Sequence, residues 1–376
     1  MTVRRKTTKK SGLTPFQRSV LWFFLKSAMV VFLTLLIYFI YLDSKITTLF
    51  SGQKWQVPAQ LYARVLHLAP GVHLSQTQFV DELKRLQYRV DPRLNGPGQY
   101  LVDGPKVHVY RRAFEFADGA QAASLFTVEF AGDFVQGLQK SGKALAKAKM
   151  EPQLLQHLVT AEQEDRELVQ LKQVPVTIRE TLLLVEDRDF YSHHGVSPLS
   201  VLRALITNLQ AGQTVQGGST LTQQLAKNMY TNQERTMVRK VNEALIALVL
   251  DYRYSKDQIL EAYFNEIFIG QFKDNPVHGL GLGSKLYFGK PLAELRPHEY
   301  ALLIAIIKGP SYYDPRRFPE RAAQRRDLIL HLMEDHGLLD GEQTKAALEQ
   351  PLDVIPLGQH LKGKYPAYID KVRQEL

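Results

Sequence analysis

The sequence of 376 residues is long enough for about two domains, and its 45% of hydrophobic residues can supply real cores. It has no cysteine, which excludes a disulfide framework and a thiolate metal site but suits either the cytosol or the periplasm. The net charge of +9 is concentrated at the start, because the first 26 residues carry seven basic side chains and no acid. Removing those seven leaves 40 basic against 38 acidic residues, which indicates a basic tail and not a nucleic-acid-binding protein.

An apolar run follows this tail, from Val20 to Leu42, interrupted only by Lys26 and ended by Asp43. As a helix rising about 1.5 Å per residue, it would span a hydrocarbon core of roughly 30 Å. A cleaved signal peptide is the alternative, but its apolar core would be shorter and would end in small residues. We therefore predict a cytoplasmic tail over 1–19 and a retained transmembrane helix over 20–42. Positive charge marks the cytoplasmic side, so the bulk of the chain would lie in the periplasm, outside the bacterial inner membrane.

Residues 57–135 have the pattern of a small α/β unit. Ser75 and Gln78 form a capping box before the apolar stripe of one helix. Apolar residues alternate on both sides of Asp103-Gly104, which predicts a hairpin, and again over 126–130, which predicts another strand. No cluster of histidines and carboxylates occurs here, which favours a binding or spacer role. From Val135 to Gln173 the composition predicts a polar, helix-forming connector with a short strand or helix at 167–171.

An acidic side chain, Glu186, directly follows the apolar run 182–185. A carboxylate at the edge of a core is desolvated on one side, which raises its pKa and makes it a possible general base or acid. The alternative is an ordinary helix end at which Glu186 pairs with Arg188 at the surface.

Two glycines at 217–218 predict a tight turn, and Ser219 is a good N-cap for the helix that follows. Thr220, Gln224 and Lys227 would share one face of that helix, which offers hydroxyl, amide and ammonium groups. Such a face suits sugar hydroxyls and a phosphate, although an ordinary solvated face is the alternative. The preceding apolar segment 198–209 is predicted to be a helix, either in the core or dipping into a bilayer surface.

A second carboxylate, Glu243, lies one helical turn after Arg239. The pair could simply stabilise its helix. Surrounded by Arg239, Lys240 and Arg253, Glu243 would instead stay ionised. One carboxyl with a raised pKa and one held ionised is the division of roles found in glycosyl-transfer sites. Farther on, a buried helix over 301–307 is predicted to lead into a loop that starts at Lys308.

Five segments, in this order, resemble the motifs of the peptidoglycan glycosyltransferases of glycosyltransferase family 51. They are EDRDFYSHHG at 186–195, GGSTLTQQLAKN at 217–228, RKVNEALIAL at 239–248, RYSKDQILEAYFNEIFIG at 253–270 and KGPS at 308–311. The anchor and the small unit resemble the 1b type of class A penicillin-binding proteins. The resemblance implies a mainly α fold, with a lysozyme-like glycosyltransferase domain over 150–350. It also implies that 57–135 is a regulatory homologue of UvrB domain 2, which docks an outer-membrane lipoprotein activator.

The implied reaction polymerises lipid II into β-1,4-linked glycan strands, with inversion at an undecaprenyl-pyrophosphate-linked donor, and moenomycin would inhibit it. Glu186 would deprotonate the acceptor 4-hydroxyl, and Glu243 would assist departure of the pyrophosphate. A divalent cation, Mg²⁺ or Mn²⁺, is expected without assigned ligands, and a homodimer or larger cell-wall synthesis complexes are possible partners. The implied substrate-binding residues are Asp187, Phe190, His193, Ser219, Thr220, Gln224, Lys227, Asn228, Arg239, Lys240, Arg253, Lys308 and Ser311.

One departure concerns the end of the chain. Class A proteins carry a transpeptidase domain after the transferase, whereas no Ser-x-x-Lys pattern with a domain of that size follows residue 350. We therefore expect 351–376 to be a linker toward an absent domain of a truncated bifunctional protein, with a naturally monofunctional transferase as the alternative. Two other functions remain open: a glycan-cleaving hydrolase or lytic transglycosylase, and a non-catalytic membrane-anchored scaffold.

Overall fold

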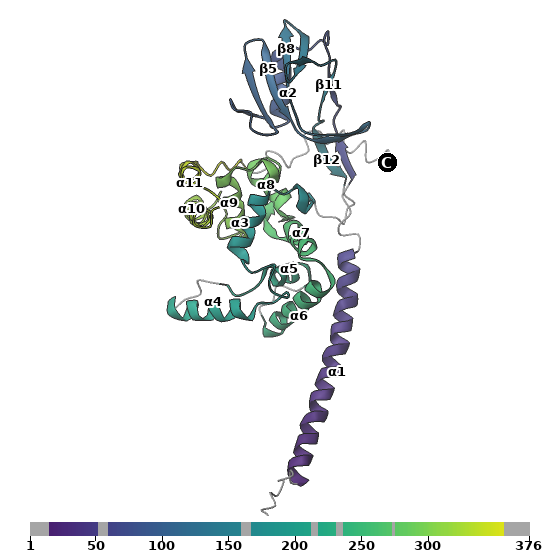
Figure 1. Ribbon diagram of the computed structural model, residues 1–376, viewed down its shortest axis with the longest axis vertical. Coiled ribbons are helices and arrows are strands. Elements are labelled where there is room, and N and C mark those ends of the chain that lie inside the picture. The colour runs from purple at the N-terminus through teal and green to yellow at the C-terminus, as the bar shows by residue number, and fades with distance from the viewer. Residues whose placement is uncertain are drawn as a thin grey trace, which may run out of the picture.

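A computed structural model describes residues 15–51, 59–158, 167–211, 217–230, 236–272 and 275–356. In chain order these form a long N-terminal helix, a small unit rich in strands and a larger unit built mostly from helices (Figure 1). The predicted fold class, a mainly helical domain behind one apolar helix and a small α/β unit, is confirmed. Most of the predicted basic tail, residues 1–14, and residues 357–376 of the predicted linker lie outside the described residues.

The first helix, α1 (Pro15–Ser51), continues nine residues beyond Leu42. Its stretch Trp22–Thr48 is long and apolar enough to cross a membrane. The described side chains from Trp22 to Ile37 are exposed, whereas Leu42 and Ile46 are buried in the core of the helical unit. The helix therefore extends beyond the predicted transmembrane segment 20–42, because packing against the helical unit holds its later turns in place.

Two polar contacts accompany this packing of α1 against the helical unit. The Tyr38 hydroxyl donates a hydrogen bond to Asn242 Oδ1 at 2.9 Å. The Arg253 guanidinium donates to both carboxylate oxygens of Asp43, with 2.6 Å between Nε and Oδ1. The C-terminal part of α1 is thus attached at two positions, Asn242 and Arg253, to one helix of the larger unit, α6 (Met237–Arg253).

The small unit packs one helix, α2 (Gln76–Arg85), against a six-stranded sheet. The order of the sheet is β10-β9-β8-β5-β4-β3, antiparallel except for the pair β3–β4. The predicted capping box of α2 and the predicted hairpin, in which Asp103 pairs with Lys106, are both confirmed. The strands are β1 (Ala59–Tyr62), β2 (Leu66–Leu68), β3 (Arg89–Val90), β4 (Gln99–Asp103), β5 (Lys106–Arg111), β6 (Phe114–Phe116), β7 (Gly119–Gln121), β8 (Ser124–Ala131), β9 (Phe134–Lys140), β10 (Lys143–Ala144), β11 (Ala148–Met150) and β12 (Leu154–Leu158).

The polar connector predicted to begin at Val135 is wrong over its first part. Residues 134–158 form four further strands, and β11 and β12 return to pair with β2 and β1. In β9 the buried side chains are Val135 and Leu138, which are three residues apart because the pairing with β8 shifts register at Glu129 and Phe130. This irregularity breaks the alternation that identifies a strand in sequence. Residues 159–166 lie outside the described residues, and 167–170 have no regular structure.

The larger unit places its helices around one extended core, into which the hairpin of β13 (Phe268–Phe272) and β14 (Asn275–His278) also packs. The predicted capping box of Ser255 and Gln258 is confirmed. The helices are η2 (Leu171–Gln173), α3 (Val176–Glu186), α4 (Pro198–Ala211), α5 (Leu221–Tyr230), α6 (Met237–Arg253), α7 (Lys256–Glu266), α8 (Leu280–Phe288), η3 (Leu292–Glu294), α9 (Pro297–Ile307), α10 (Pro319–Asp335) and α11 (Gly341–Leu348).

Two apolar helices have opposite environments. In α9 every residue except Pro297 is buried, as expected for a central core helix. In α4 the apolar side chains Leu199, Leu202, Ile206 and Leu209 are all exposed, so the core-helix alternative for this segment is wrong. A contiguous row of exposed apolar side chains is typical of a surface that contacts a membrane or another protein.

A charged contact joins the small unit to the helical unit. Arg112, which follows β5, forms a two-point ion pair with Glu294 of η3, with 3.0 Å between Nη2 and Oε2. The same guanidinium reaches Glu151 at 3.2 Å and lies over the Tyr88 ring. Gly98 leaves room for this pair, since a Cβ there would come within 2.6 Å of Glu294 Oε2.

Candidate active site

A cavity of about 870 Å³ opens in the helical unit where the ends of α3 and α9 meet α5, α6 and α10. All five motif segments contribute to its lining, although they are far apart in the sequence. Two of its lining carboxylates, Glu186 and Glu243, have contrasting environments.

Glu186 ends α3 and keeps only a small exposed surface, which faces the cavity. Gln224 Nε2 donates a hydrogen bond to its Oε2 at 2.9 Å. Desolvation by burial raises the pKa of Glu186, while the Gln224 hydrogen bond and the charges of Arg325 and Lys308 act in the opposite direction. The alternative surface pair with Arg188 is not observed, because Arg188 Nε donates to the Leu184 carbonyl instead. The carboxylate therefore has the environment of a general base or acid, with its pKa raised by burial.

The start of α5 is fixed to the segment after α3 by side chains of both motifs. Thr220 caps the helix, because its Oγ1 accepts from Gln223 N at 3.2 Å while its own hydroxyl donates to the Gly195 carbonyl at 2.6 Å. Asp187 Oδ2 accepts from Leu221 N at 2.8 Å. The predicted N-cap, Ser219, is therefore wrong by one residue, and its Oγ accepts from Lys240 Nζ instead.

Glu243 is the second carboxylate, and its side chain is almost completely buried. Arg239 Nη1 pairs with its Oε1, and Lys240 Nζ lies 3.0 Å from its Oε2. The ion pair predicted between Arg239 and Glu243 is therefore present. Arg253, expected to complete this group, instead pairs with Asp43 of α1 and does not line the cavity.

The predicted site residues divide into two groups. Three more of them do not line the cavity: Phe190 is fully buried in the core, His193 Nε2 bonds Asp187 at 2.9 Å, and Ser311 is exposed just beyond the lining. Those that the structure brings to the cavity are Glu186, Asp187, Ser219, Thr220, Gln224, Lys227, Asn228, Arg239, Lys240, Glu243 and Lys308.

Several lining residues were missed by the sequence analysis. Arg325 of α10 lies outside every motif, yet its charge acts on both Glu186 and Lys308. The pKa of Lys308 is lowered, first by burial and then by the Arg325 charge. No local signal distinguishes Arg325 from the other arginines of its helix, so only the packing of α10 against α3 and α9 could identify it. Arg188, Arg203, Ser200 and Gln223 also line the cavity.

A divalent cation requires carboxylate oxygens that are not already paired. Each of the four carboxylates that line the cavity accepts from a protein donor: Glu186 from Gln224, Asp187 from Leu221, Asp189 from Arg203 and Glu243 from Arg239. Free carboxylate oxygens remain, but among the described residues no group of three His, Asp or Glu side chains brings its ligand atoms together at the cavity, so the protein alone offers no preformed cation site there.

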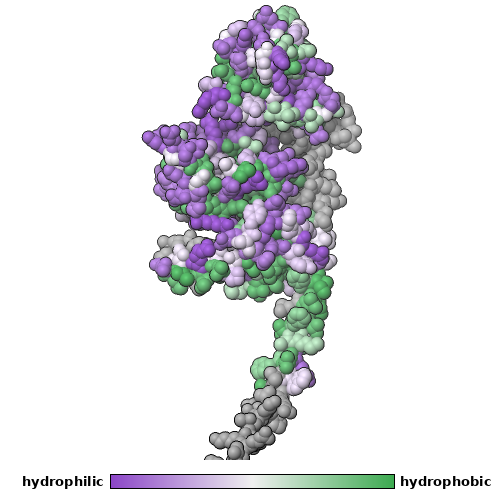
Figure 2. All heavy atoms as spheres, in the orientation of Figure 1, coloured by the Kyte–Doolittle hydropathy of each residue, from purple (hydrophilic) through white to green (hydrophobic). Residues whose placement is uncertain are grey.

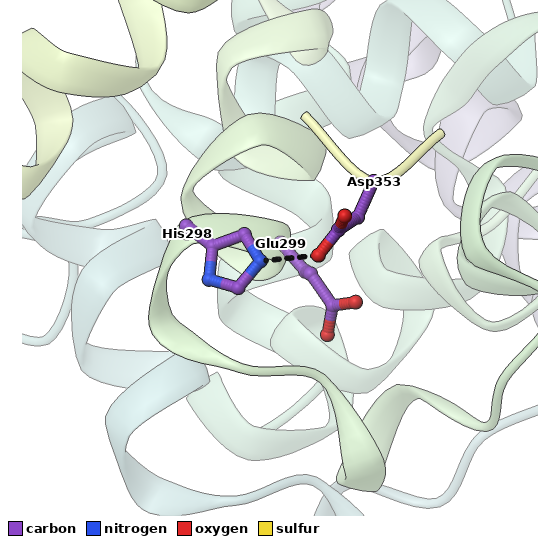
Figure 3. Close-up of side chains that lie close together, drawn as sticks. All are labelled: His298, Glu299 and Asp353. Atoms are coloured by element: carbon purple, nitrogen blue, oxygen red, sulfur yellow. Dashed lines mark hydrogen bonds and ion pairs between the residues drawn. The ribbon is translucent and has the colours of Figure 1, made fainter. Parts of the chain in front are cut away.

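A cluster outside the cavity, His298, Glu299 and Asp353, has three potential ligand atoms within 4.8 Å of one another (Figure 3). His298 Nε2 lies 3.1 Å from Asp353 Oδ2, as the dashed line in Figure 3 shows. Both oxygens of Glu299 are already used, by Lys290 Nζ and by the backbone N–H of Arg296. The Lys290 ammonium occupies the position that a metal ion would need, and Glu299 caps the start of α9. The cluster therefore does not fit a metal site.

Residues 151–334, which carry this cavity, match the family model described as Transglycosylase. Residues 68–150 match the model described as Bifunctional transglycosylase second domain. The chain belongs to the transglycosylase family. The cavity and both glutamates thus lie within its transglycosylase domain, and the six-stranded sheet within the second domain.

Three relatives of this transglycosylase cover most of the chain, and each is named Penicillin-binding protein 1B. The protein from Vibrio cholerae is 45% identical over 90% of the chain, that from Haemophilus influenzae is 38% identical over 100%, and that from Escherichia coli is 39% identical over 94%. The matched regions make up 44%, 48% and 42% of these relatives, so the chain spans less than half of their length.

Proposed function

We propose that the chain is a peptidoglycan glycosyltransferase that polymerises lipid II into β-1,4-linked glycan strands. The observation that carries this proposal is the partly buried Glu186, whose pKa is raised, in the same cavity as Glu243 with Arg239 and Lys240. A carboxylate with a raised pKa can accept a proton, and a cationic group can stabilise a leaving pyrophosphate. The names of the family and of the relatives support the same reaction class.

In the proposed reaction, the 4-hydroxyl oxygen of the acceptor attacks C1 of the donor sugar. Glu186 takes the hydroxyl proton as the new C1–O bond forms on the face opposite the leaving group. The bond from C1 to the undecaprenyl pyrophosphate breaks, and the electron pair leaves with the phosphate oxygen. The outcome is inversion, from an α-linked pyrophosphate to a β-1,4 glycosidic bond.

The cationic side of the cavity is assigned to the donor pyrophosphate. Arg239 and Lys240 flank Glu243, and Lys227 of α5 and Lys308 after α9 also line the cavity. These charges stabilise the leaving group, while Ser219 and Asn228 offer hydrogen bonds to phosphate or sugar oxygens. Any Mg²⁺ or Mn²⁺ would be bound through the substrate's own phosphates, and no step is assigned to it.

We also propose that the cavity works at a membrane surface, where a lipid-linked substrate is found. Helices α4 and α6 lie at the end of the helical unit past which the apolar part of α1 extends, and hydrophobic atoms gather along that end (Figures 1 and 2). The exposed apolar side chains of α6 are Met237, Val238 and Val241. From Trp22, about 20 residues of α1 cross roughly 30 Å and end near Leu42, which is already packed on the helical unit. With the basic start in the cytoplasm, the helical unit would lie on the periplasmic face of the inner membrane.

The small unit is proposed to dock an outer-membrane lipoprotein activator, and homodimers or larger cell-wall synthesis complexes would be further partners. It is joined to the helical unit by Arg112 and Glu294, so its position relative to the cavity is defined. Stimulation by such a lipoprotein that persists when residues 57–135 are deleted would exclude this docking role.

Polymerisation of purified lipid II in vesicles, followed by strand length, tests the proposed reaction. The wild-type chain should form long strands that moenomycin blocks, and Glu186→Gln should lose about a hundredfold or more in rate. Glu180→Gln is the matched control, because Glu180 is exposed on the same helix. Full activity of Glu186→Gln would exclude Glu186 as the base. Release of soluble fragments from preformed glycan would instead identify a cleaving enzyme. If the chain shows neither polymerisation nor cleavage, the scaffold alternative is favoured.

A further inference from the structure

A tyrosine behind the cavity, Tyr263, is connected to Glu186 through one amide. Its hydroxyl lies 2.9 Å from Gln224 Oε1, and Gln224 Nε2 lies 2.9 Å from Glu186 Oε2. Tyr263 comes from α7, Gln224 from α5 and Glu186 from α3, so the chain of hydrogen bonds joins three helices. Tyr263 is fully buried and does not line the cavity, so it cannot touch a substrate there.

The chemistry of the three groups fixes the direction of both hydrogen bonds. An ionised carboxylate can only accept, so the Gln224 atom that faces Glu186 must be its NH₂ group. The opposite end of the amide is then its carbonyl oxygen, which can only accept, so the tyrosine hydroxyl must donate. Burial raises the pKa of Tyr263 well above its ordinary value, and the hydroxyl therefore keeps its proton at the pH at which Glu186 is ionised.

We infer that Tyr263 is a positioning residue, which holds the Gln224 amide so that Glu186 presents Oε1 to the acceptor hydroxyl. Oε2 is occupied by Gln224, and no described residue hydrogen-bonds to Oε1. A single rotamer of the carboxylate then points the free oxygen into the cavity. The inference rests on the proposed function, because the orientation of Glu186 Oε1 matters only if Glu186 accepts the proton of the acceptor hydroxyl.

The test compares Tyr263→Phe with the full wild-type chain in lipid II polymerisation, over a range of pH. Without the hydroxyl the amide can turn, so the hydrogen bond that favours the ionised carboxylate weakens. We expect kcat to fall about ten- to a hundredfold with little change in KM. We also expect the pH at which activity reaches half of its maximum to move upward.

Tyr287→Phe is the matched control, because Tyr287 is also buried and its hydroxyl donates to a backbone carbonyl, that of Ile269. A purely structural loss would affect both variants alike, in unfolding temperature and in rate, and would leave both pH profiles where they are. If Tyr263→Phe has the kcat and pH profile of Tyr287→Phe, the inference is overturned. In a Gln224→Ala background, Tyr263→Phe should have no further effect on the pH profile.

A second variant covers the case in which Tyr263→Phe unfolds more easily than its control. Gln224→Met keeps the tyrosine intact and interrupts the same chain of hydrogen bonds, so it must also move the pH profile upward. An unmoved profile overturns the inference. Two further results separate the inference from the proposed function: a wild-type chain that does not polymerise lipid II overturns the function, whereas Glu186→Gln that polymerises as well as wild type excludes Glu186 as the base and overturns the inference with it.

Discussion

The carboxylate of Asp187 accepts a hydrogen bond from the backbone N–H of Leu221, 2.8 Å away. Asp187, the residue after the candidate base Glu186, thereby holds the first turn of α5, the helix that carries Gln224. Asp187 and Leu221 are 34 residues apart in the chain, and the same carboxylate oxygen also accepts from His193. The position of Glu186 relative to Gln224 therefore depends on a carboxylate that need not touch the substrate.

Replacing Asp187 with alanine should destabilise the chain by at least about 2 kcal/mol, because a buried helix cap and the partner of a buried ring are lost together. Chemical denaturation measures this loss. Asp340→Ala is the control, since Asp340 is the exposed N-cap of α11, accepts from Gln343 N at 2.8 Å, and should cost about 1 kcal/mol. Equal losses in the two variants would contradict a special role for Asp187.

The stability of the chain should depend on pH through Glu186. Burial raises its pKa in the folded state, so its contribution to stability is complete below the unfolded pKa, about 4.3, and is lost as pH rises through the folded value. Glu186→Gln does not titrate, so its unfolding temperature should rise relative to wild type as pH increases from about 4. Thermal unfolding at several pH values tests this expectation. The difference should stay flat for Glu180→Gln, whose side chain is exposed.

Arg325 should tune the working pH of the site. Burial raises the pKa of Glu186, and the Arg325 charge opposes that rise. Arg325→Gln should therefore raise the pKa further and move the rising part of the activity profile to higher pH. Arg317→Gln, at an exposed arginine that does not line the cavity, should leave the profile unchanged. A shift toward lower pH in Arg325→Gln would contradict the assignment.

The ion pair between Arg112 and Glu294 should matter far more to stability than the exposed pair of Arg85 and Glu82. The side chains of Arg112 and Glu294 are 16% and 8% exposed. Removing one partner of a buried pair typically costs about 3–5 kcal/mol. Glu294→Ala should approach that loss, whereas Glu82→Ala should cost less than about 1 kcal/mol. Denaturant unfolding compares them. If Arg112→Leu with Glu294→Leu is as unstable as Glu294→Ala, the loss is not due to an unpaired buried charge.

The sequence predicted those features that depend on local pattern. The capping boxes before α2 and α7, the β4–β5 hairpin and the acid-poor start of α5 all follow from residues within a few positions of one another. The ion pair of Arg239 and Glu243 is equally local, at one helical turn. These are the interactions for which spacing in the chain determines distance in space.

The features that were missed depend on contacts between distant segments. Arg325 reaches the cavity only because α10 packs against α3 and α9. Arg253 was expected beside Glu243 but turns to Asp43, more than 200 residues earlier in the chain. The connector predicted over 135–173 begins in strands instead, because a register shift between β8 and β9 hides the alternation of β9. Propensity and periodicity carry no information about such contacts.

Helix α9 lies between the ion pair of Arg112 with Glu294 and the part of the cavity that Lys308 lines. Glu294 stands just before its first turn, paired with Arg112 of the small unit, and Lys308 stands at its end, in the cavity. Its 11 residues span about 16 Å, and core packing on all sides leaves the helix no freedom to bend. The helix therefore keeps a fixed spacing between the ion pair beside the small unit and the Lys308 ammonium in the cavity.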